Sequence, residues 1–243
     1  MNYNQLFDVK GKVVLVTGGS RGIGEMIATG FVAAGAKVYI SSRSVEACEK
    51  VAAELSLKGP GQCISIPANL AKLEEVHRLV AELSKKEDRA TWGETFSDYP
   101  DEAFDKIVTL NLKRVFSLTQ ACYELLKAKA TTSNPSSVIN IGSVDGIRAT
   151  GLHQLTRHLA GRLGEEGILV NAIAPGPFQS KMMKATLDAF GDVIISKVPV
   201  GRIGSAEDIA GTCIYLASRA GNYTNGALIT VDGGVTIGNI SKI

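Results

Sequence analysis

Two hydrophobic patterns alternate along the chain, and each predicts a different kind of element. Continuous apolar runs predict β-strands buried on both faces, and these runs cover residues 12–18, 37–43, 62–69, 136–143, 169–176 and 227–234. Apolar residues three and four apart predict amphipathic helices, over residues 22–36, 44–56, 73–83, 103–128, 152–165 and from 205 onward. Ser205 and Asp208 have the spacing of a capping box, which marks the start of the last helix.

Repeated strand–helix units with short connections predict an α/β fold. We expect a Rossmann-type, doubly wound parallel sheet with helices on both faces, in a single domain that spans residues 1–243. The alternation fails around residues 88–98, where two predicted helices follow each other directly and a strand is expected between them.

Composition and charge narrow the possible partners. The net charge of +2, with Lys and Arg scattered, gives no electrostatic reason to expect a nucleic acid or membrane partner. No apolar run is long enough to span a membrane, and the N-terminus lacks the apolar core of a signal peptide. We therefore expect a cytoplasmic protein. The ending Ser241-Lys242-Ile243 resembles the Ser-Lys-Leu peroxisomal signal and leaves that location open.

Cysteine and histidine spacing argues against metal sites and disulfides. The four cysteines are widely spaced without a C-x-x-C pair, so we expect reduced thiols. His153 and His158 are five residues apart and cannot share one helix face. We predict no metal site.

A glycine-rich turn, TGGSRGIG, follows the first predicted strand and opens the first predicted helix. Glycines here let the backbone approach a pyrophosphate, and the helix N-terminus offers free N–H groups. This context predicts a dinucleotide site, with candidate residues Thr17, Gly18, Ser20, Arg21, Gly22, Ile23 and Gly24.

The end of the second predicted strand indicates which dinucleotide is bound. An NAD enzyme usually carries a carboxylate here for the ribose 2′-hydroxyl, whereas this chain has Ser41, Ser42 and Arg43. Arg43 and Arg21 can pair with a 2′-phosphate. The sequence therefore favours NADP(H).

Taken in order, TGGSRGIG, TLNL, INIGS, LVNAIAPG and VDGG resemble the short-chain dehydrogenase/reductase family, most of all its NADPH-dependent 3-oxoacyl-carrier-protein reductases. The resemblance implies catalytic roles for Asn111 and Ser143. It also implies that Pro175, Gly176 and Ser180 hold the nicotinamide end. Asn69 and Leu70 match the adenine segment, where the family usually has an aspartate before the apolar residue.

Two elements of the family pattern are missing from the sequence. One is the fourth strand, expected between Arg89 and Trp92, and the other is the Tyr-x-x-x-Lys pair, expected between Gly146 and Leu155. The pair Tyr123 and Lys127 precedes Ser143 instead of following it, so we reject it as the catalytic pair. Loss of a central strand would leave unpaired backbone groups inside the sheet. We therefore favour an omission from the sequence over a deletion in the protein.

The resemblance implies an enzyme that reduces a ketone with NADPH, most simply a 3-oxoacyl thioester. It also implies a homodimer or homotetramer, assembled through the helices at 103–128 and 152–165. The alternative is a non-catalytic dinucleotide-binding or scaffold protein, if the missing tyrosine and lysine are genuinely deleted.

Overall fold

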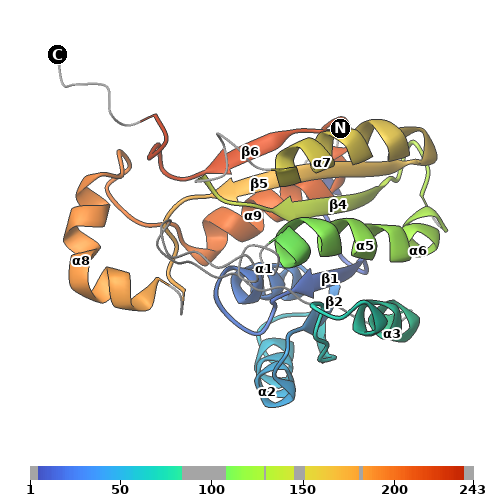
Figure 1. Ribbon diagram of the computed structural model, residues 1–243, viewed down its shortest axis with the longest axis horizontal. Helices are drawn as coiled ribbons and strands as arrows, with labels where there is room; N and C mark the ends of the chain where they lie inside the picture. Colours follow the sequence, from blue (N-terminus) through green and yellow to red (C-terminus); the bar gives the residue numbers. More distant parts are fainter. Residues whose placement is uncertain (1–4, 84–107, 129, 145–150, 181–182, 238–243) are drawn as a thin grey trace.

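The computed structural model describes residues 5–83, 108–128, 130–144, 151–180 and 183–237 (Figure 1). The N-terminal elements are β1 (Val13–Thr17), α1 (Gly22–Ala33), β2 (Lys37–Ser41), α2 (Val45–Ser56), β3 (Gln62–Ser65) and α3 (Leu73–Leu83). After the first gap come η3 (Thr109–Lys113), α5 (Arg114–Ala121), α6 (Tyr123–Lys127), β4 (Ser136–Ile141) and α7 (Gly151–Leu163). The C-terminal elements are η5 (Gly164–Glu166), β5 (Ile168–Pro175), α8 (Lys184–Ser196), α9 (Ala206–Ala217), η6 (Arg219–Gly221) and β6 (Leu228–Val231).

In the part of the chain that the structure describes, six strands form two parallel sheets of three strands each. One sheet has the order β1-β2-β3 and the other the order β4-β5-β6. Val13 pairs with Lys37 at the start of the first ladder, and Ser136 pairs with Ile168 at the start of the second. Parallel strands joined by helices confirm the predicted α/β fold of Rossmann type.

The missing strand is predicted to lie between β1, at the edge of one sheet, and β4, at the edge of the other. Within the described residues, no strand joins β1 to β4. All eight residues of β5 are buried, whereas in β1 only Val16 is buried and Val13 is 66% exposed. The sequence of β1, VVLVT, is typical of a strand in the interior of a sheet. In the described residues, however, β1 has only one neighbouring strand, β2. Residues 89–92 lie outside the described residues.

One hydrophobic core joins both sheets. Phe31 of α1, Ile40 of β2, Ile173 of β5 and Leu216 of α9 belong to the same buried cluster. Helices α1 and α9 pack together, with Gly30 so close to Ala210 that a Cβ on the glycine would lie 2.3 Å from the alanine Cβ. Shared packing therefore connects two sheets that share no strand.

Several predicted elements differ in detail from the structure. The helix predicted over 103–128 is wrong as a single element, because its described part is a π-helical segment, η3, followed by α5 and a break at Cys122 before α6. The third strand ends at Ser65 rather than at 69, ahead of Pro67, which has no N–H to donate to a ladder. The capping box of Ser205 and Asp208 is confirmed.

The remaining expectations concern thiols, membranes and the chain end. All four cysteines are free, as predicted. Among the described residues, no helix has the length and apolar character needed to cross a bilayer. Ser241-Lys242-Ile243 lies outside the described residues.

Candidate dinucleotide and carbonyl site

The glycine-rich turn lies between the end of β1 and the start of α1, as predicted. Thr17 ends β1 and Arg21 is the N-cap residue of α1, so Gly18, Ser20, Gly22, Ile23 and Gly24 lie in the turn and the first helical turn. A Cβ on Gly24 would lie 2.4 Å from the carbonyl oxygen of Gly18. Only glycine fits at this close approach, which lets the turn fold over the helix N-terminus as a pyrophosphate site requires.

The turn is joined to the end of β2 by side-chain hydrogen bonds. Ser20, which is 8% exposed, donates from its hydroxyl to that of Ser42 over 2.7 Å. The Ser42 hydroxyl also lies 3.1 Å from the Cys48 sulfur of α2. Arg43 and Arg21 beside this pair are both exposed. Two cations at the end of β2 and in the turn fit a 2′-phosphate.

The segment after β5 reaches the same turn. A Cβ on Gly22 would lie 3.2 Å from the Ser180 Cβ, so these two residues are neighbours across the site. Pro175 ends β5, and the N–H of Gly176 donates to the Val231 carbonyl over 3.0 Å. The structure therefore brings the predicted nicotinamide segment against the predicted pyrophosphate turn.

The predicted adenine segment lies in the turn between β3 and α3, residues 66–72, which we call the β3–α3 turn. The Asn69 side-chain oxygen accepts from the Ala71 N–H over 3.1 Å, so it stabilises the turn itself. Leu70 is 3% exposed and packs in a cluster with Val76 and Leu79. Its side chain therefore belongs to the core, and contact with a base would come from the backbone of this turn.

The predicted catalytic residues lie at the end of β4 and in η3. Ser143 is half-buried just beyond β4, where the Gly142 N–H continues the ladder by donating to the Ile173 carbonyl over 2.8 Å. Asn111 is half-buried in the π-helical segment, a local form that is frequent at functional sites. The start of α7 lies against this segment, since a Cβ on Gly151 would lie 3.0 Å from Leu112.

His153 is a buried residue near Ser143 for which the sequence predicts no role. Its side chain is 5% exposed, and its Nε2 atom has no hydrogen-bond partner within the described part of the chain. A Cβ on Gly142 would lie 2.9 Å from that atom. Burial, and then the Arg157 charge, lower the pKa of His153, which favours a neutral imidazole. A single histidine on a helical face gives no sequence signal of this kind.

Tyr123 and Lys127 lie at the other end of the strands. The Lys127 ammonium donates to the Tyr123 hydroxyl over 3.1 Å and pairs with Glu166 over 2.6 Å, and Tyr123 donates to the same carboxylate. Glu166 precedes β5, whose eight residues span roughly 25 Å at about 3.3 Å each. Ser143 follows β4 and Pro175 ends β5, at the opposite ends of these strands, so the geometry agrees with the rejection of this pair.

A second group that the sequence does not predict is Glu75, Arg78 and Glu82 on α3. Their carboxylate and guanidinium groups bind one another and the backbone of the β3–α3 turn. The only signal in the sequence is E-x-x-R-x-x-x-E, which is also typical of a solvated helix surface.

Comparison with known proteins places these features in a family. The family model described as Enoyl-(Acyl carrier protein) reductase matches residues 18–236. A Pseudomonas aeruginosa protein, the rhamnolipids biosynthesis 3-oxoacyl-[acyl-carrier-protein] reductase, is 41% identical over 251 residues, covering 94% of this chain and 97% of its own. A 3alpha-hydroxysteroid dehydrogenase of Mediterraneibacter gnavus is 31% identical and covers 93% of this chain and 97% of its own.

A solved structure has a closely similar fold. The Pseudomonas aeruginosa RhlG/NADP active-site complex matches with a TM-score of 0.89 and 39% identity, covering 98% of this chain and all of that chain. The sequence alignment with the Pseudomonas reductase spans 251 residues although this chain has 243 and is only 94% covered. The relative therefore has residues for which this chain has no counterpart.

Proposed function

The chain belongs to the short-chain dehydrogenase/reductase family, and on that premise we propose that it reduces a ketone to a secondary alcohol with NADPH. The substrate that we propose is a 3-oxoacyl thioester or a similar carbonyl compound. Family membership confirms the predicted oxidoreductase class and NADP(H) as the cofactor. The choice of substrate and the roles of single residues are proposals.

The observation that carries the cofactor assignment is the hydrogen bond between Ser20 and Ser42, next to Arg43. The two hydroxyls bond over 2.7 Å at the point where the phosphate turn meets the end of β2. Residues 41–43 hold no carboxylate that would repel a 2′-phosphate. Arg43 and Arg21 are exposed there and free of the large desolvation cost that a buried cation would carry.

The chain's own residues prepare the carbonyl for reduction. Bound NADPH supplies the hydride. Ser143 donates a hydrogen bond to the carbonyl oxygen, and Asn111 in the π-helical segment holds a water for proton supply. The proton donor itself is missing, because Tyr215 and Tyr223 are the tyrosines that follow Ser143 and neither has a lysine four residues later. General acid catalysis is typically worth about 10²- to 10⁴-fold, so we expect this 243-residue chain to turn over slowly at best.

We propose that the active protein contains the two segments that this sequence lacks. The edges of β1 and β4 support this, since β1 has a central-strand sequence but only one strand neighbour in the described residues. The longer alignment with the Pseudomonas reductase supports it as well. The comparisons lend no support to the non-catalytic alternative, because the relatives are named as reductases and dehydrogenases.

The substrate proposal rests on relatives and on the segment after β5. The two relatives named above are named for a 3-oxoacyl-[acyl-carrier-protein] and for a hydroxysteroid, so the family does not fix the substrate. Helix α8 exposes Phe190 and Val193, at 60% and 52%, and buries none of its residues. These apolar side chains suit an acyl chain. Phe178, by contrast, is 2% exposed in the core and is not available to a substrate.

Two measurements test the proposal together. The first is NADPH consumption with acetoacetyl thioester, by this chain and by the protein isolated from its natural host. The second is the intact mass of that natural protein, compared with 25.6 kDa for this sequence. We expect a heavier natural protein that consumes NADPH and a 243-residue chain that hardly does. A natural protein of 25.6 kDa would contradict the proposed omission, and rapid turnover by this chain would contradict the need for the missing pair.

The predicted homodimer or homotetramer remains a proposal, because it rests on the resemblance to the family alone. Helices α5 and α6 expose Phe116 and Leu125, at 42% and 47%, on the segment that we expect to assemble. Light scattering after size-exclusion chromatography gives the mass of the assembly.

A further inference from the structure

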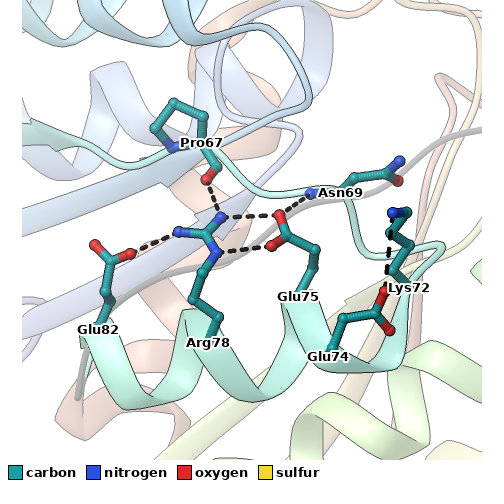
Figure 2. A network of polar contacts seen from close by, with 7 residues as sticks. All are labelled: Pro67, Asn69, Lys72, Glu74, Glu75, Arg78 and Glu82. Atoms are coloured by element: carbon teal, nitrogen blue, oxygen red, sulfur yellow. Dashed lines mark hydrogen bonds and ion pairs between the residues drawn. The ribbon is translucent and has the colours of Figure 1, made fainter.

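The ion pair of Arg78 and Glu75 on α3 binds two backbone groups of the β3–α3 turn, the Pro67 carbonyl through Arg78 and the Asn69 N–H through Glu75 (Figure 2). Its Nε and Nη2 atoms donate to the two Glu75 carboxylate oxygens over 2.7 and 2.9 Å. Nη2 also donates to the Pro67 carbonyl over 2.8 Å, and Nη1 donates to Glu82 over 2.6 Å. Glu75 in turn accepts from the Asn69 N–H over 3.3 Å. The carbonyl of one turn residue and the N–H of another are thus bound to one ion pair.

The opposite side of the same turn is bound to the end of β2. The Ala68 N–H donates to the Ser42 carbonyl over 3.1 Å, and the Ile66 N–H donates to the Ile40 carbonyl over 2.9 Å. Ser42 is also the partner of Ser20 in the proposed 2′-phosphate site. The ion pair therefore acts on backbone that is one hydrogen bond away from that site.

The side chains of the turn pack into the core, but they do not bind the backbone N–H of Asn69. Ala68 and Leu70 are each 3% exposed and pack into the core with Leu79. Asn69 between them is half-buried, and its side chain is already used within the turn. The Asn69 carbonyl accepts from the Lys72 N–H over 3.1 Å, whereas its N–H is bound by the Glu75 carboxylate, which Arg78 fixes.

The geometry differs from that of an ordinary surface ion pair. Lys50 and Glu54 on α2 approach to 3.9 Å, with side chains 73% and 51% exposed. Here the contacts are 2.6 to 2.9 Å, and the side chains are less exposed, at 43% for Arg78, 27% for Glu75 and 23% for Glu82. The planar Arg78 guanidinium binds the Glu75 carboxylate through Nε and Nη2, the Pro67 carbonyl through the same Nη2 and the Glu82 carboxylate through Nη1, which fixes direction as well as distance. This arrangement suits a positioning role better than a solvated pair does.

We infer that Glu75 and Arg78 are positioning residues for the adenine half of the dinucleotide, because they fix the β3–α3 turn against which that half binds. The inference rests on the proposed function, and it assigns no contact between either residue and the cofactor. It predicts that loss of the ion pair weakens binding of the adenine half and spares the nicotinamide half.

The test uses two fragments of the cofactor as separate probes. Calorimetry measures binding of 2′,5′-ADP and of reduced nicotinamide mononucleotide to the full chain and to Arg78→Met, Arg78→Lys and Glu75→Gln. We expect Arg78→Met to weaken 2′,5′-ADP about fivefold to tenfold, as a moderate coupling does, with the mononucleotide unchanged. Arg78→Lys should fall between, since an ammonium cannot reproduce the three-way contact. Lys50→Met is the matched control and should bind both fragments as the parent does.

The outcomes separate the inference from the function on which it rests. Equal binding of 2′,5′-ADP by the parent and Arg78→Met would overturn the inference and leave the proposed cofactor intact. Equal weakening of both fragments would also overturn it, because it would indicate a general loss of structure. No binding of 2′,5′-ADP by the parent chain would instead overturn the proposed NADP(H) site.

Discussion

The Ser20 hydroxyl donates to the Ser42 hydroxyl over 2.7 Å, which joins the turn after β1 to the residue that follows β2. Ser42 also accepts, through its carbonyl, from Ala68 in the β3–α3 turn. Three segments far apart in sequence thus meet around one serine. In a parallel sheet all of them follow the carboxyl ends of neighbouring strands, which is where α/β proteins bind their ligands.

Arg43 should determine the preference for NADPH over NADH. We expect Arg43→Glu to raise the dissociation constant for NADPH about tenfold or more, since it replaces attraction to a 2′-phosphate by repulsion. Binding of NADH should change little. Fluorescence titration with both nucleotides measures the two constants.

Lys58→Glu is the control for this change. It alters the net charge equally but lies beyond the far end of α2, whose twelve residues span roughly 18 Å. If Arg43→Glu weakened NADPH and NADH equally, or if Lys58→Glu had the same effect, Arg43 would not be a 2′-phosphate ligand.

Substitutions of Gly142 and His153 should have coupled effects on stability, because the two residues are in contact. Gly142→Ala places a Cβ 2.9 Å from the His153 Nε2 atom, so we expect destabilisation of about 1–3 kcal/mol from overpacking. His153→Ala on the Gly142→Ala background should recover part of that loss, because the clash is removed. Urea unfolding of the two single variants and the double variant gives the coupling between them.

Gly161→Ala is the control, since this helical glycine in α7 has no atom within 4 Å of the position of a new Cβ. We expect it to stabilise the chain by up to about 1 kcal/mol. Strictly additive effects of Gly142→Ala and His153→Ala would contradict the contact.

Glu75 should make the stability of the chain depend on pH in the acid range. The hydrogen bond from Arg78 lowers the pKa of Glu75 from 4.5 to about 2, against the opposing effect of burial. Because the folded pKa lies below the unfolded one, the carboxylate stabilises the fold above about pH 4.5 and loses this effect as the pH falls towards 2. The melting temperatures of the parent and Glu75→Gln, followed over this range, should therefore converge on acidification. A constant difference would refute the ion pair, and added salt should shrink the difference, since both side chains are partly exposed.

Tyr123 and Lys127 should have no part in catalysis. We expect Tyr123→Phe and Lys127→Met to leave NADPH binding and any NADPH consumption unchanged, because the pair lies beside Glu166, ahead of β5. Their effect on stability should be small, as for exposed ion pairs. Ser143→Ala in the natural protein, by comparison, should slow turnover strongly. Loss of turnover in Tyr123→Phe would contradict this prediction and would indicate that Tyr123 donates the proton.

Much of the fold could be predicted because buried parallel strands have unmistakable apolar runs. β2 and β5 are predicted from such runs, as is β1, whose run is apolar although only Val16 is buried, and the capping box of Ser205 and Asp208 marks the start of α9. The phosphate turn was recognisable because close backbone approach restricts residue choice, as at Gly24. Within the described residues β1 pairs only with β2, which agrees with the strand that the sequence pattern lacks.

The features that escaped prediction depend on tertiary contacts. The π-helical segment around Asn111 has one extra residue per turn, which the same apolar spacing cannot distinguish from an α-helix. Glu75 and Arg78 have the spacing of a common surface pair, and their link to Pro67 exists only once the chain folds back. The burial of His153 against Gly142 likewise depends on how α7 packs on β4. These contacts carry no local signal.

The most direct test of the account is the ratio of NADH to NADPH dissociation constants for the parent chain, measured by nucleotide fluorescence at one ionic strength. A site built around Ser20, Ser42 and Arg43 should bind NADPH at least about tenfold more tightly than NADH, with a ratio that falls as salt is added. Equal affinities, or tighter binding of NADH, would contradict the proposed 2′-phosphate site and with it the NADPH-dependent reductase.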